Sequence, residues 1–521
     1  MNDLVQKTST LIQSSVLSLI IALLSSTAYA ADLSPFELEV IQPRPALDEN
    51  NRYYRAYPGI EYNVDINVVG GRYPYKYELT QKPTGMVINS DTGEVSWSAP
   101  EENNNAYAVQ IKVTDSEGTQ QNVSWTIKVT KEKFLFVDAV NGTIGAPGTL
   151  ENPMKTFEDV YGGLDYTAKN AITNQHNFVY FRGPSDPSDS SHTYIPQGFT
   201  AGKPGVQWTY RHPAVLMAYP GENPRFDFSN TYFFGDTVLD NFYIEGFNIT
   251  QISSVSQPGQ YHFAFRIPGN SSNVTFRRNS FNNLATSTGS YNQSVIMMTS
   301  SSSRGKDWAI VNNEFANLQH AYGVLGYTVE NVLIANNYIH DTSDPEGTGS
   351  SHAIGPKVDC TKWFIRKNVL KNIGNSGIWL YYASKLDGQE FGNMEVSYNY
   401  VEGNTPLTVN DKWAAAELPS HFFRNTFVGK VNFDYVNSGT GPFFLSKNVI
   451  INDPSNHVKC TSCDAPERII QDSNLTGDNS SNIVNEFGNL TDGFSQYIGL
   501  IGWQTNLITS QPLAPFLIVK Q

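Results

Sequence analysis

The sequence has little cysteine and few charged residues. Only three of its 521 residues are cysteines, too few for a framework of disulfides holding a small domain together. Charged residues make up 16%, whereas glycine, asparagine, serine and aromatic residues are frequent. This composition favours a β-rich extracellular protein over a helical one.

Positive charge is also in deficit. Lysine and arginine total 35 against 49 aspartates and glutamates, for a formal net charge of −14. That balance argues against nucleic acid as a partner. It does not exclude an anionic polymer, because a local basic patch can override the net charge.

Long hydrophobic runs are missing after the first thirty residues. Near the start, a lysine precedes the apolar run 16–24 and the small-residue sequence 28–30. This pattern predicts a signal peptide over residues 1–30, with the mature protein beginning near Ala31 or Asp32. No later segment reaches the roughly 18 apolar residues of a membrane span. We therefore expect a secreted or periplasmic monomer.

Two of the three cysteines lie close together. Cys460 and Cys463 stand in a segment with loop composition, which in an oxidising compartment favours a local disulfide between them. Cys360 can instead pair with one of them, or lie free and buried.

Residues 32–130 predict a small antiparallel β-sandwich. The segments 61–69 and 107–114 alternate apolar and polar residues, and turn signals recur about every ten residues. The stretch 82–97 resembles the immunoglobulin-like, cadherin-like modules of bacterial exported proteins. Such modules space or dock other domains, so we expect no chemistry here. Asp115 with Glu117 alone does not make a calcium site.

An asparagine repeat dominates the second half of the chain. A three-residue pattern, asparagine followed by any residue and then a large apolar residue, recurs at intervals of 34, 24, 31, 31, 26 and 23 residues. Asn248 adds one interval of 31 upstream. The repeated asparagines are Asn279, Asn313, Asn337, Asn368, Asn399, Asn425 and Asn448. Such a period indicates a solenoid, with stacked side-chain amides bonding between coils. Asparagine also tolerates the left-handed backbone of a tight turn.

The start of this second part resembles the pectate-lyase-like superfamily. Residues 134–169 read as a strand followed by a helix that caps the open end of a solenoid, and residues 214–227 resemble one of its coils. The resemblance implies an all-β fold, a right-handed parallel β-helix over residues 131–521. The tail from about residue 453 lacks the repeat and is expected to form a C-terminal cap.

A second strand in each coil offers candidate functional residues. Alternation directs Ile354, Ile378 and Leu380 inward. Residues in the same register on successive coils lie roughly 5 Å apart. The same alternation directs other side chains to the outer face: His352, Lys357, Trp379, Tyr381, Asn410 or Lys412, and Asp434. On that face, Tyr327, Lys357, Tyr381 and Asn410 can form one column.

The segment 352–368 resembles, in spacing, the coil that carries the lysine base of chondroitinase B and related alginate lyases. The resemblance implies β-elimination on a uronate-containing glycan, with Lys357 as the base and a calcium ion neutralising the carboxylate. Here Ser350, Ser351 and His352 replace the acidic calcium ligands, and tyrosines replace an arginine on the next coil. We therefore expect His352 or Lys385 to neutralise the carboxylate and Tyr381 to donate a proton.

Long loops over residues 283–294, 341–351 and 384–392 flank this column and can form a binding groove. The residues expected to bind a polysaccharide substrate are Tyr327, Trp379, Tyr382, Lys385, Asn410, Lys412 and Trp413, and Tyr322 can also stack on a sugar ring.

Two other functions remain open. A glycoside hydrolase needs two carboxyl groups across a groove, which Asp411 with Asp434, or Asp359 with Asp387, can supply. A surface protein that binds glycans without cleaving them needs no such pair. The irregular coil lengths favour an enzyme, and the resemblance favours a lyase.

Overall fold

Strands make up nearly all of the regular structure. The computed structural model describes residues 34–44, 51–161, 178–196, 206–208, 215–228, 233–235, 238–250, 263–284, 293–344, 351–382, 391–412, 417–439, 441–451, 457–472 and 474–477. Within them the helices are α2 (Phe157–Tyr161), η2 (Arg52–Tyr54) and η4 (Pro466–Arg468). The expected signal peptide lies outside the described residues.

The N-terminal β-sandwich contains strands β1 to β9. A four-stranded sheet has the order β2-β9-β8-β5, a three-stranded sheet the order β3-β7-β6, and β1 pairs with β4. Alternate residues of β8 and β9 are buried in one core, as an antiparallel sandwich requires. The strands are β1 (Glu39–Gln42), β2 (Arg55–Ala56), β3 (Tyr62–Asp65), β4 (Asn67–Val69), β5 (Lys76–Gln81), β6 (Met86–Ile88), β7 (Glu94–Trp97), β8 (Tyr107–Thr114) and β9 (Gln120–Val129).

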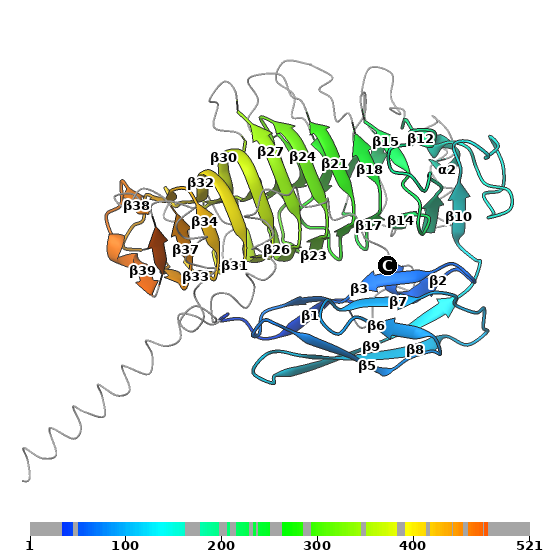
Figure 1. Cartoon of the computed structure of the whole chain (residues 1–521), viewed down its shortest axis with the longest axis horizontal. Coiled ribbons are helices and arrows are strands. Elements are labelled where there is room, and N and C mark those ends of the chain that lie inside the picture. Colours follow the sequence, from blue (N-terminus) through cyan, green and yellow to red (C-terminus); the bar gives the residue numbers. More distant parts are fainter. Residues whose placement is uncertain are drawn as a thin grey trace, which may run out of the picture.

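The rest of the described chain forms a right-handed parallel β-helix whose coils lie side by side in Figure 1. We name its three faces A, B and C. Face A is a 12-stranded parallel sheet, and faces B and C are joined in a sheet of 19 strands through the long strands β30 and β32. The expected parallel solenoid is therefore confirmed.

The strands of face A are β10 (Phe134–Val137), β11 (Phe178–Phe181), β14 (Val215–Ala218), β17 (Tyr243–Glu245), β20 (Thr275–Arg277), β23 (Gly305–Val311), β26 (Val329–Ala335), β29 (Thr361–Arg366), β31 (Glu395–Ser397), β33 (Ser420–Phe423), β36 (Phe443–Ser446) and β39 (Ile469–Asp472). Face B contains β12 (Thr193–Tyr194), β15 (Arg225–Asp227), β18 (Asn248–Thr250), β21 (Ser280–Leu284), β24 (Glu314–Gln319), β27 (Tyr338–Ser343), the first halves of β30 (Val369–Tyr381) and β32 (Tyr400–Asn410), β34 (Thr426–Val428), β37 (Val449–Ile451) and β40 (Leu475–Gly477). Face C contains β13 (Val206–Trp208), β16 (Phe233–Gly235), β19 (Phe263–Pro268), β22 (Ser294–Thr299), β25 (Tyr322–Gly326), β28 (Ile354–Pro356), the second halves of β30 and β32, β35 (Val431–Asp434) and β38 (Val458–Thr461).

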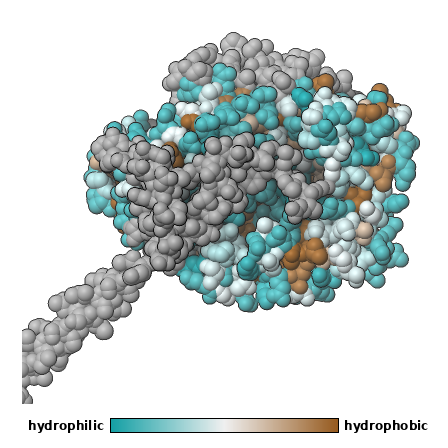
Figure 2. Space-filling model, viewed as in Figure 1, coloured by the Kyte–Doolittle hydropathy of each residue, from teal (hydrophilic) through white to brown (hydrophobic). Residues whose placement is uncertain are grey.

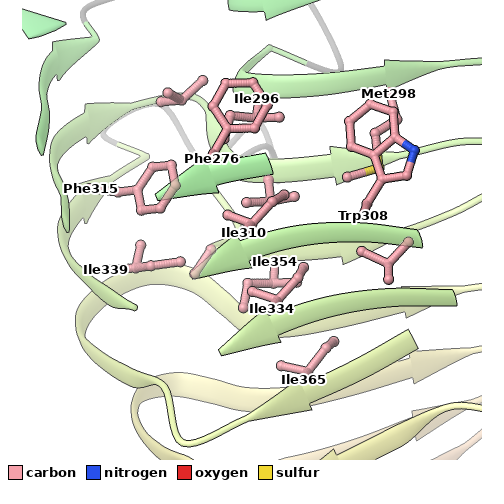
Figure 3. Packing of buried hydrophobic residues seen from close by; sticks show 14 of the residues in the cluster. Phe276, Ile296, Met298, Trp308, Ile310, Phe315, Ile334, Ile339, Ile354 and Ile365 are labelled. Carbon is pink, nitrogen blue, oxygen red and sulfur yellow. The ribbon is translucent and has the colours of Figure 1, made fainter. Parts of the chain in front are cut away.

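Stacked aliphatic and aromatic side chains fill the interior of the solenoid (Figure 3). Ile310, Ile334 and Ile365 come from successive strands of face A and are fully buried opposite Ile296 and Ile354 of face C. Phe157 and Val160 of α2 join the same core, so this helix covers the first coil. Capping of this kind keeps the apolar end of a solenoid away from water.

The asparagine ladder exists and runs along the turn between faces A and B. Asn368 donates from Nδ2 to Asn399 Oδ1 at 3.0 Å and to the Ile334 carbonyl at 2.8 Å. Its own Oδ1 accepts from both the backbone N–H and the side chain of Asn337. The same pattern repeats from Asn279 to Asn448.

Three details of the expected ladder are wrong. Asn279 Oδ1 accepts from the Phe247 backbone, and Asn248 pairs with Ser280, so Asn248 lies one residue past the ladder position. The C-terminal segment continues the ladder, because Asn448 donates to Asn474. The left-handed backbone belongs to the residue before each ladder asparagine, with φ between 51° and 59° at Arg278, Asn312, Asn336, Lys367, Tyr398, Arg424 and Lys447. The hydrogen bonds of the asparagine side chains therefore stabilise a turn whose left-handed backbone most residues disfavour.

The β-sandwich packs along face A (Figure 1). Ile41 and Val69 of the sandwich share an apolar cluster with Ala309, Leu333 and Phe364 of the solenoid. The exposed surface in Figure 2 is mostly hydrophilic, with hydrophobic residues in small separate groups. No helix among the described residues is long and apolar enough to cross a membrane.

Candidate active site

The outward column predicted on face C is present. Ile354 pairs with Ile378 in the parallel sheet, which places Lys357 beside Tyr381 three residues further along. Tyr381 pairs in turn with Asn410, and Asn410 with Asp434. Ile354, Ile378 and Leu380 point inward and are fully buried, as alternation requires.

Aromatic rings surround this column. The imidazole of His352 stacks on Trp379, with centroids 4.3 Å apart and planes at 19°. Trp379 stacks also on Tyr381 at 5.0 Å, and Tyr322 lies 4.9 Å from His352. Gly355 makes room for this packing, because a Cβ there would lie 2.6 Å from the Tyr322 ring.

Lys357 lies against the faces of three of these rings. Its Nζ is 4.6 Å from the centroid of Trp379, 5.4 Å from that of Tyr381 and 5.7 Å from that of Tyr322. Only 8% of the residue is exposed, and burial lowers the pKa of its amine to about 8. With such a pKa, roughly a tenth of the amines are neutral at pH 7, enough for a general base.

His352 has one ring nitrogen already occupied. Its Nδ1 accepts a hydrogen bond from the Ser376 backbone N–H at 3.3 Å, which leaves the proton of a neutral ring on Nε2. The residue is 3% exposed. His352 is therefore suited to donate from Nε2 and to position Trp379, rather than to act as a base through Nδ1.

Other candidates lie near the column at different depths. Tyr327, Trp379 and Asn410 are half-buried, and Lys412 is exposed with its Nζ 6.0 Å from the Tyr435 ring centroid. Lys385 and Trp413 lie outside the described residues. The three flanking loops also lie partly outside them.

The binding roles expected for two tyrosines do not fit the structure. Tyr382 is 1% exposed, packs against Phe391 in the solenoid core and shares a 2.9 Å hydrogen bond with Ser420 Oγ. It follows the outward Tyr381, so strand alternation turns it inward. Tyr322 is 1% exposed and packs on Trp379.

One member of each carboxylate pair expected for a hydrolase is buried. Asp359 is 1% exposed and is held by Arg304, with Nη2 to Oδ1 at 2.6 Å and Nε to Oδ2 at 3.0 Å. Asp411 is fully buried, because it follows the outward Asn410. Asp387 lies outside the described residues. Asp434 stays half-buried on the column, where burial raises the pKa of its carboxyl group.

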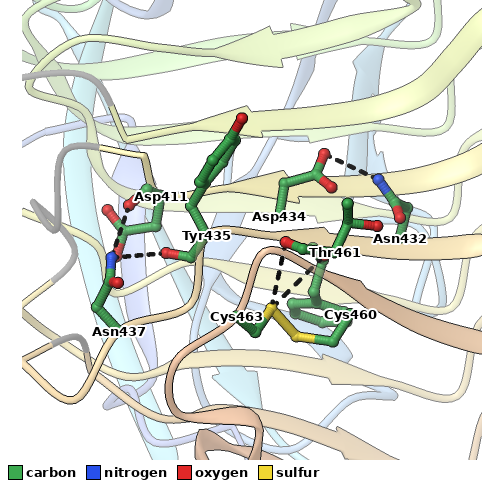
Figure 4. Close-up of a disulfide and its surroundings, with 9 residues drawn as sticks. Asp411, Asn432, Asp434, Tyr435, Asn437, Cys460, Thr461 and Cys463 are labelled. Atoms are coloured by element: carbon green, nitrogen blue, oxygen red, sulfur yellow. Dashed lines mark hydrogen bonds between the residues drawn. A yellow bond between two sulfur atoms is a disulfide. The ribbon is translucent and has the colours of Figure 1, made fainter.

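The local disulfide is confirmed and lies next to Asp434 (Figure 4). It joins Cys460 and Cys463, and Cys360 is a free, buried thiol. Thr461 pairs with Asp434 in the parallel sheet. The disulfide thus fixes the turn that follows the last described strand of face C.

Among the residues that the structure describes, calcium ligands are not gathered around Lys357. Within the described part of the chain, no three His, Cys, Asp or Glu side chains come together to hold a metal ion. The carboxylates Asp359 and Asp411 are buried, and Asp359 is bound by Arg304. The described residues do not fit a calcium ion, so calcium takes no step in the mechanism below.

Comparison with known proteins identifies the N-terminal part. Residues 44–130 match the family model described as "Putative Ig domain" (He_PIG). The β-sandwich is an Ig-like domain. No curated protein matches the chain.

Two solved structures resemble the chain weakly. The GH136 lacto-N-biosidase from Eubacterium ramulus matches with a TM-score of 0.34 and 10% identity, over 66% of this chain and 68% of that one. The periplasmic alginate epimerase AlgG matches with a TM-score of 0.33 and 13% identity, over 55% and 78% of the two chains. Similarity at this level does not indicate an activity.

Within the Ig-like domain, Asp115 has a structural role. Its carboxylate accepts hydrogen bonds from the backbone N–H groups of Arg72, Glu117 and Thr119. These bonds close the turn between β8 and β9 and tie it to the segment after β4. The arrangement is that of an aspartate-stabilised turn.

Proposed function

We propose that this chain is an exported enzyme that cleaves a uronate-containing polysaccharide by β-elimination on face C. The observation that carries the proposal is Lys357, an amine with a pKa of about 8 that lies among three aromatic rings and in register with Tyr381. A buried amine of lowered pKa on a surface column is a candidate general base.

The reaction assigns one step to each of two residues. The neutral amine of Lys357 removes the proton from the carbon next to the uronate carboxylate. The Tyr381 hydroxyl gives its proton to the glycosidic oxygen as the bond from that oxygen to the adjacent ring carbon breaks. A carbon–carbon double bond forms in the sugar ring, and a new hydroxyl ends the other fragment. Lys357 then loses its extra proton to solvent, and the Tyr381 oxygen takes a proton from solvent, which restores both residues.

The neighbouring residues hold the substrate. His352 donates a hydrogen bond from Nε2 toward the uronate carboxylate, which with Lys385 favours loss of the proton. Trp379 and Tyr327 offer half-buried ring surface to sugar rings, and Asn410 offers an amide on the next coil. Lys412 is exposed and can add a charged contact. Trp413 is a further candidate for stacking on a sugar ring.

The test is incubation of purified protein with a panel of uronate and neutral polysaccharides, with and without a chelator. Both the ultraviolet absorbance of unsaturated uronate and the reducing ends are followed, and a Lys357→Met variant serves as the control. Absorbance that rises together with reducing ends, and disappears in the variant, is the expected result. N-terminal sequencing of the exported protein tests cleavage before Ala31 or Asp32.

A glycoside hydrolase is the second candidate, favoured by Asp434. Its carboxyl group lies on the same column, and burial raises its pKa in the direction a general acid needs. New reducing ends without absorbance, lost in Asp434→Asn, would assign this function. If neither absorbance nor reducing ends rose with any polysaccharide of the panel, the remaining candidate would be a non-catalytic glycan-binding protein.

A further inference from the structure

A small pocket is lined by residues of the Ig-like domain and of face A, among them Arg366 of β29 and Glu395 of β31. Figure 1 shows the Ig-like domain beneath β31. Its volume is about 110 Å³, and its lining includes three arginines and three tyrosines from both domains: Arg72, Arg366, Arg424, Tyr73, Tyr75 and Tyr398. The proposed active site is elsewhere, since Lys357 follows β28 on face C.

Arg366 is the most buried of the three arginines, at 4% exposure. Its Nη1 donates to the Tyr75 hydroxyl. Its Nη2 lies 3.2 Å from Glu395 Oε1, but neither Nη2 nor Nε has a hydrogen-bond acceptor among the described residues. Buried donors of this kind are rarely left without an acceptor.

The nearest carboxylate is already engaged. Glu395 is 2% exposed, and its two oxygens accept from Ser34 Oγ at 2.6 Å and Ser397 Oγ at 2.8 Å. The second carboxylate on the pocket wall, Glu117, has a mostly exposed side chain 3.4 Å from Arg72 Nε. Glu395 therefore faces Arg366 as a counter-ion, but it accepts no hydrogen bond from Nη2 or Nε.

Arg72 adds a further unsatisfied donor from the Ig-like domain. Its Nη1 is buried without an acceptor among the described residues. Three arginines against the two glutamates Glu117 and Glu395 give the pocket wall a formal charge of +1. Guanidinium groups are the preferred partners of carboxylate, sulfate and phosphate oxygens.

We propose that this pocket binds a small oxyanion, held between Arg72 of the Ig-like domain and Arg366 of the solenoid. Several acceptor oxygens on one anion can meet the N–H groups of both arginines at once. The net positive charge of the pocket wall favours an anion, and 110 Å³ has room for a sulfate, phosphate or carboxylate group. Such an anion connects the two domains.

The experiment measures binding of sulfate and phosphate to the full chain by calorimetry and by the shift in Tm, at constant ionic strength. The comparison uses Arg72→Gln, Arg366→Gln and the control Arg266→Gln, which changes an exposed arginine on face C. We expect saturable binding to the wild type and to the control, and at least a tenfold rise in Kd for both pocket variants. Arg72 is partly exposed, so Arg72→Gln keeps the test valid if Arg366→Gln fails to fold.

General salt effects are distinguishable, because sulfate excluded from the surface stabilises all variants alike and without saturation. Stabilisation of all variants alike, or equal Kd values for Arg72→Gln and wild type, would overturn the proposal. Water would then be the partner of the arginine N–H groups. A second arm compares glucuronate and a sulfated monosaccharide with glucose. Binding of the charged sugars at least tenfold tighter than inorganic sulfate would assign the oxyanion to a glycan, and equal or weaker binding to a free anion.

Discussion

Arg277 of β20 and Asp65 of β3 form a buried two-point ion pair across the junction between the two domains. Nε lies 2.7 Å from Oδ2 and Nη2 lies 2.7 Å from Oδ1, and Arg277 is 1% exposed. Arg277 also pairs with Glu245 of the neighbouring coil. Burial alone would raise the pKa of Asp65, but the charge and hydrogen bonds of Arg277 outweigh it and lower that pKa.

Replacing Arg277 should weaken the junction strongly. Arg277→Met leaves the buried Asp65 and the half-buried Glu245 without their shared cation, and we expect a loss of about 3–5 kcal/mol in the free energy of unfolding. Arg266→Met, at an exposed position, is the matched control and should change it by less than about 0.5 kcal/mol. Denaturant unfolding measures both, and equal small effects would contradict the importance of the pair.

The ladder should be most sensitive at its centre. Asn368→Ala removes four hydrogen bonds at a fully buried position, so unfolding should become easier by about 2–4 kcal/mol. Asn248→Ala, one residue outside the ladder, should cost less than about 1 kcal/mol. Similar losses for the two variants would show that the amide stack contributes little.

The buried His421 should make the free energy of unfolding depend on pH. Burial lowers the pKa of its imidazole from 6.5 to about 4, although Glu395 acts in the opposite direction. Between these values the unfolded chain binds a proton that the folded chain does not, so stability falls as the pH drops from 6.5 toward 4. His421→Phe keeps a ring on Phe444 and should flatten this dependence by roughly 2–4 kcal/mol. Unfolding curves at several pH values measure it, and an unchanged slope would contradict the assignment.

Tyr381→Phe separates proton donation from ring stacking. The phenyl ring can still stack on Trp379, so KM should stay within about threefold while kcat falls by about 100-fold or more. Tyr327→Phe, on the same column, is the control and should keep kcat. Steady-state kinetics on the best polysaccharide of the panel decides, and an unchanged kcat in Tyr381→Phe would remove its role as proton donor.

The sequence predicted the register of the site better than its packing. Spacing from the ladder and strict alternation were enough to place Lys357, Tyr381, Asn410 and Asp434 on one column. The prediction placed Tyr382 and Asp411 on the outer face as well, which is wrong. Each directly follows an outward residue of the column, so strand alternation turns it inward.

Long-range partners had no signal in the sequence. The Tyr322 ring that packs on His352 needs the space over Gly355, and the Arg277–Asp65 pair joins residues 212 apart. Neither follows from a local pattern, because side-chain packing and domain docking are set by the folded surfaces. The roles of the column residues in catalysis remain predictions.

The most direct test of the account is the rate of unsaturated-uronate formation by the wild type and Lys357→Met across about pH 6 to 9. Because the base must be deprotonated, the wild-type rate should rise with pH and level off above the Lys357 pKa of about 8. Lys357→Met should be slower by about 100-fold or more at every pH. A variant that keeps the wild-type rate, or a wild-type rate that does not rise through this range, would contradict Lys357 as the base.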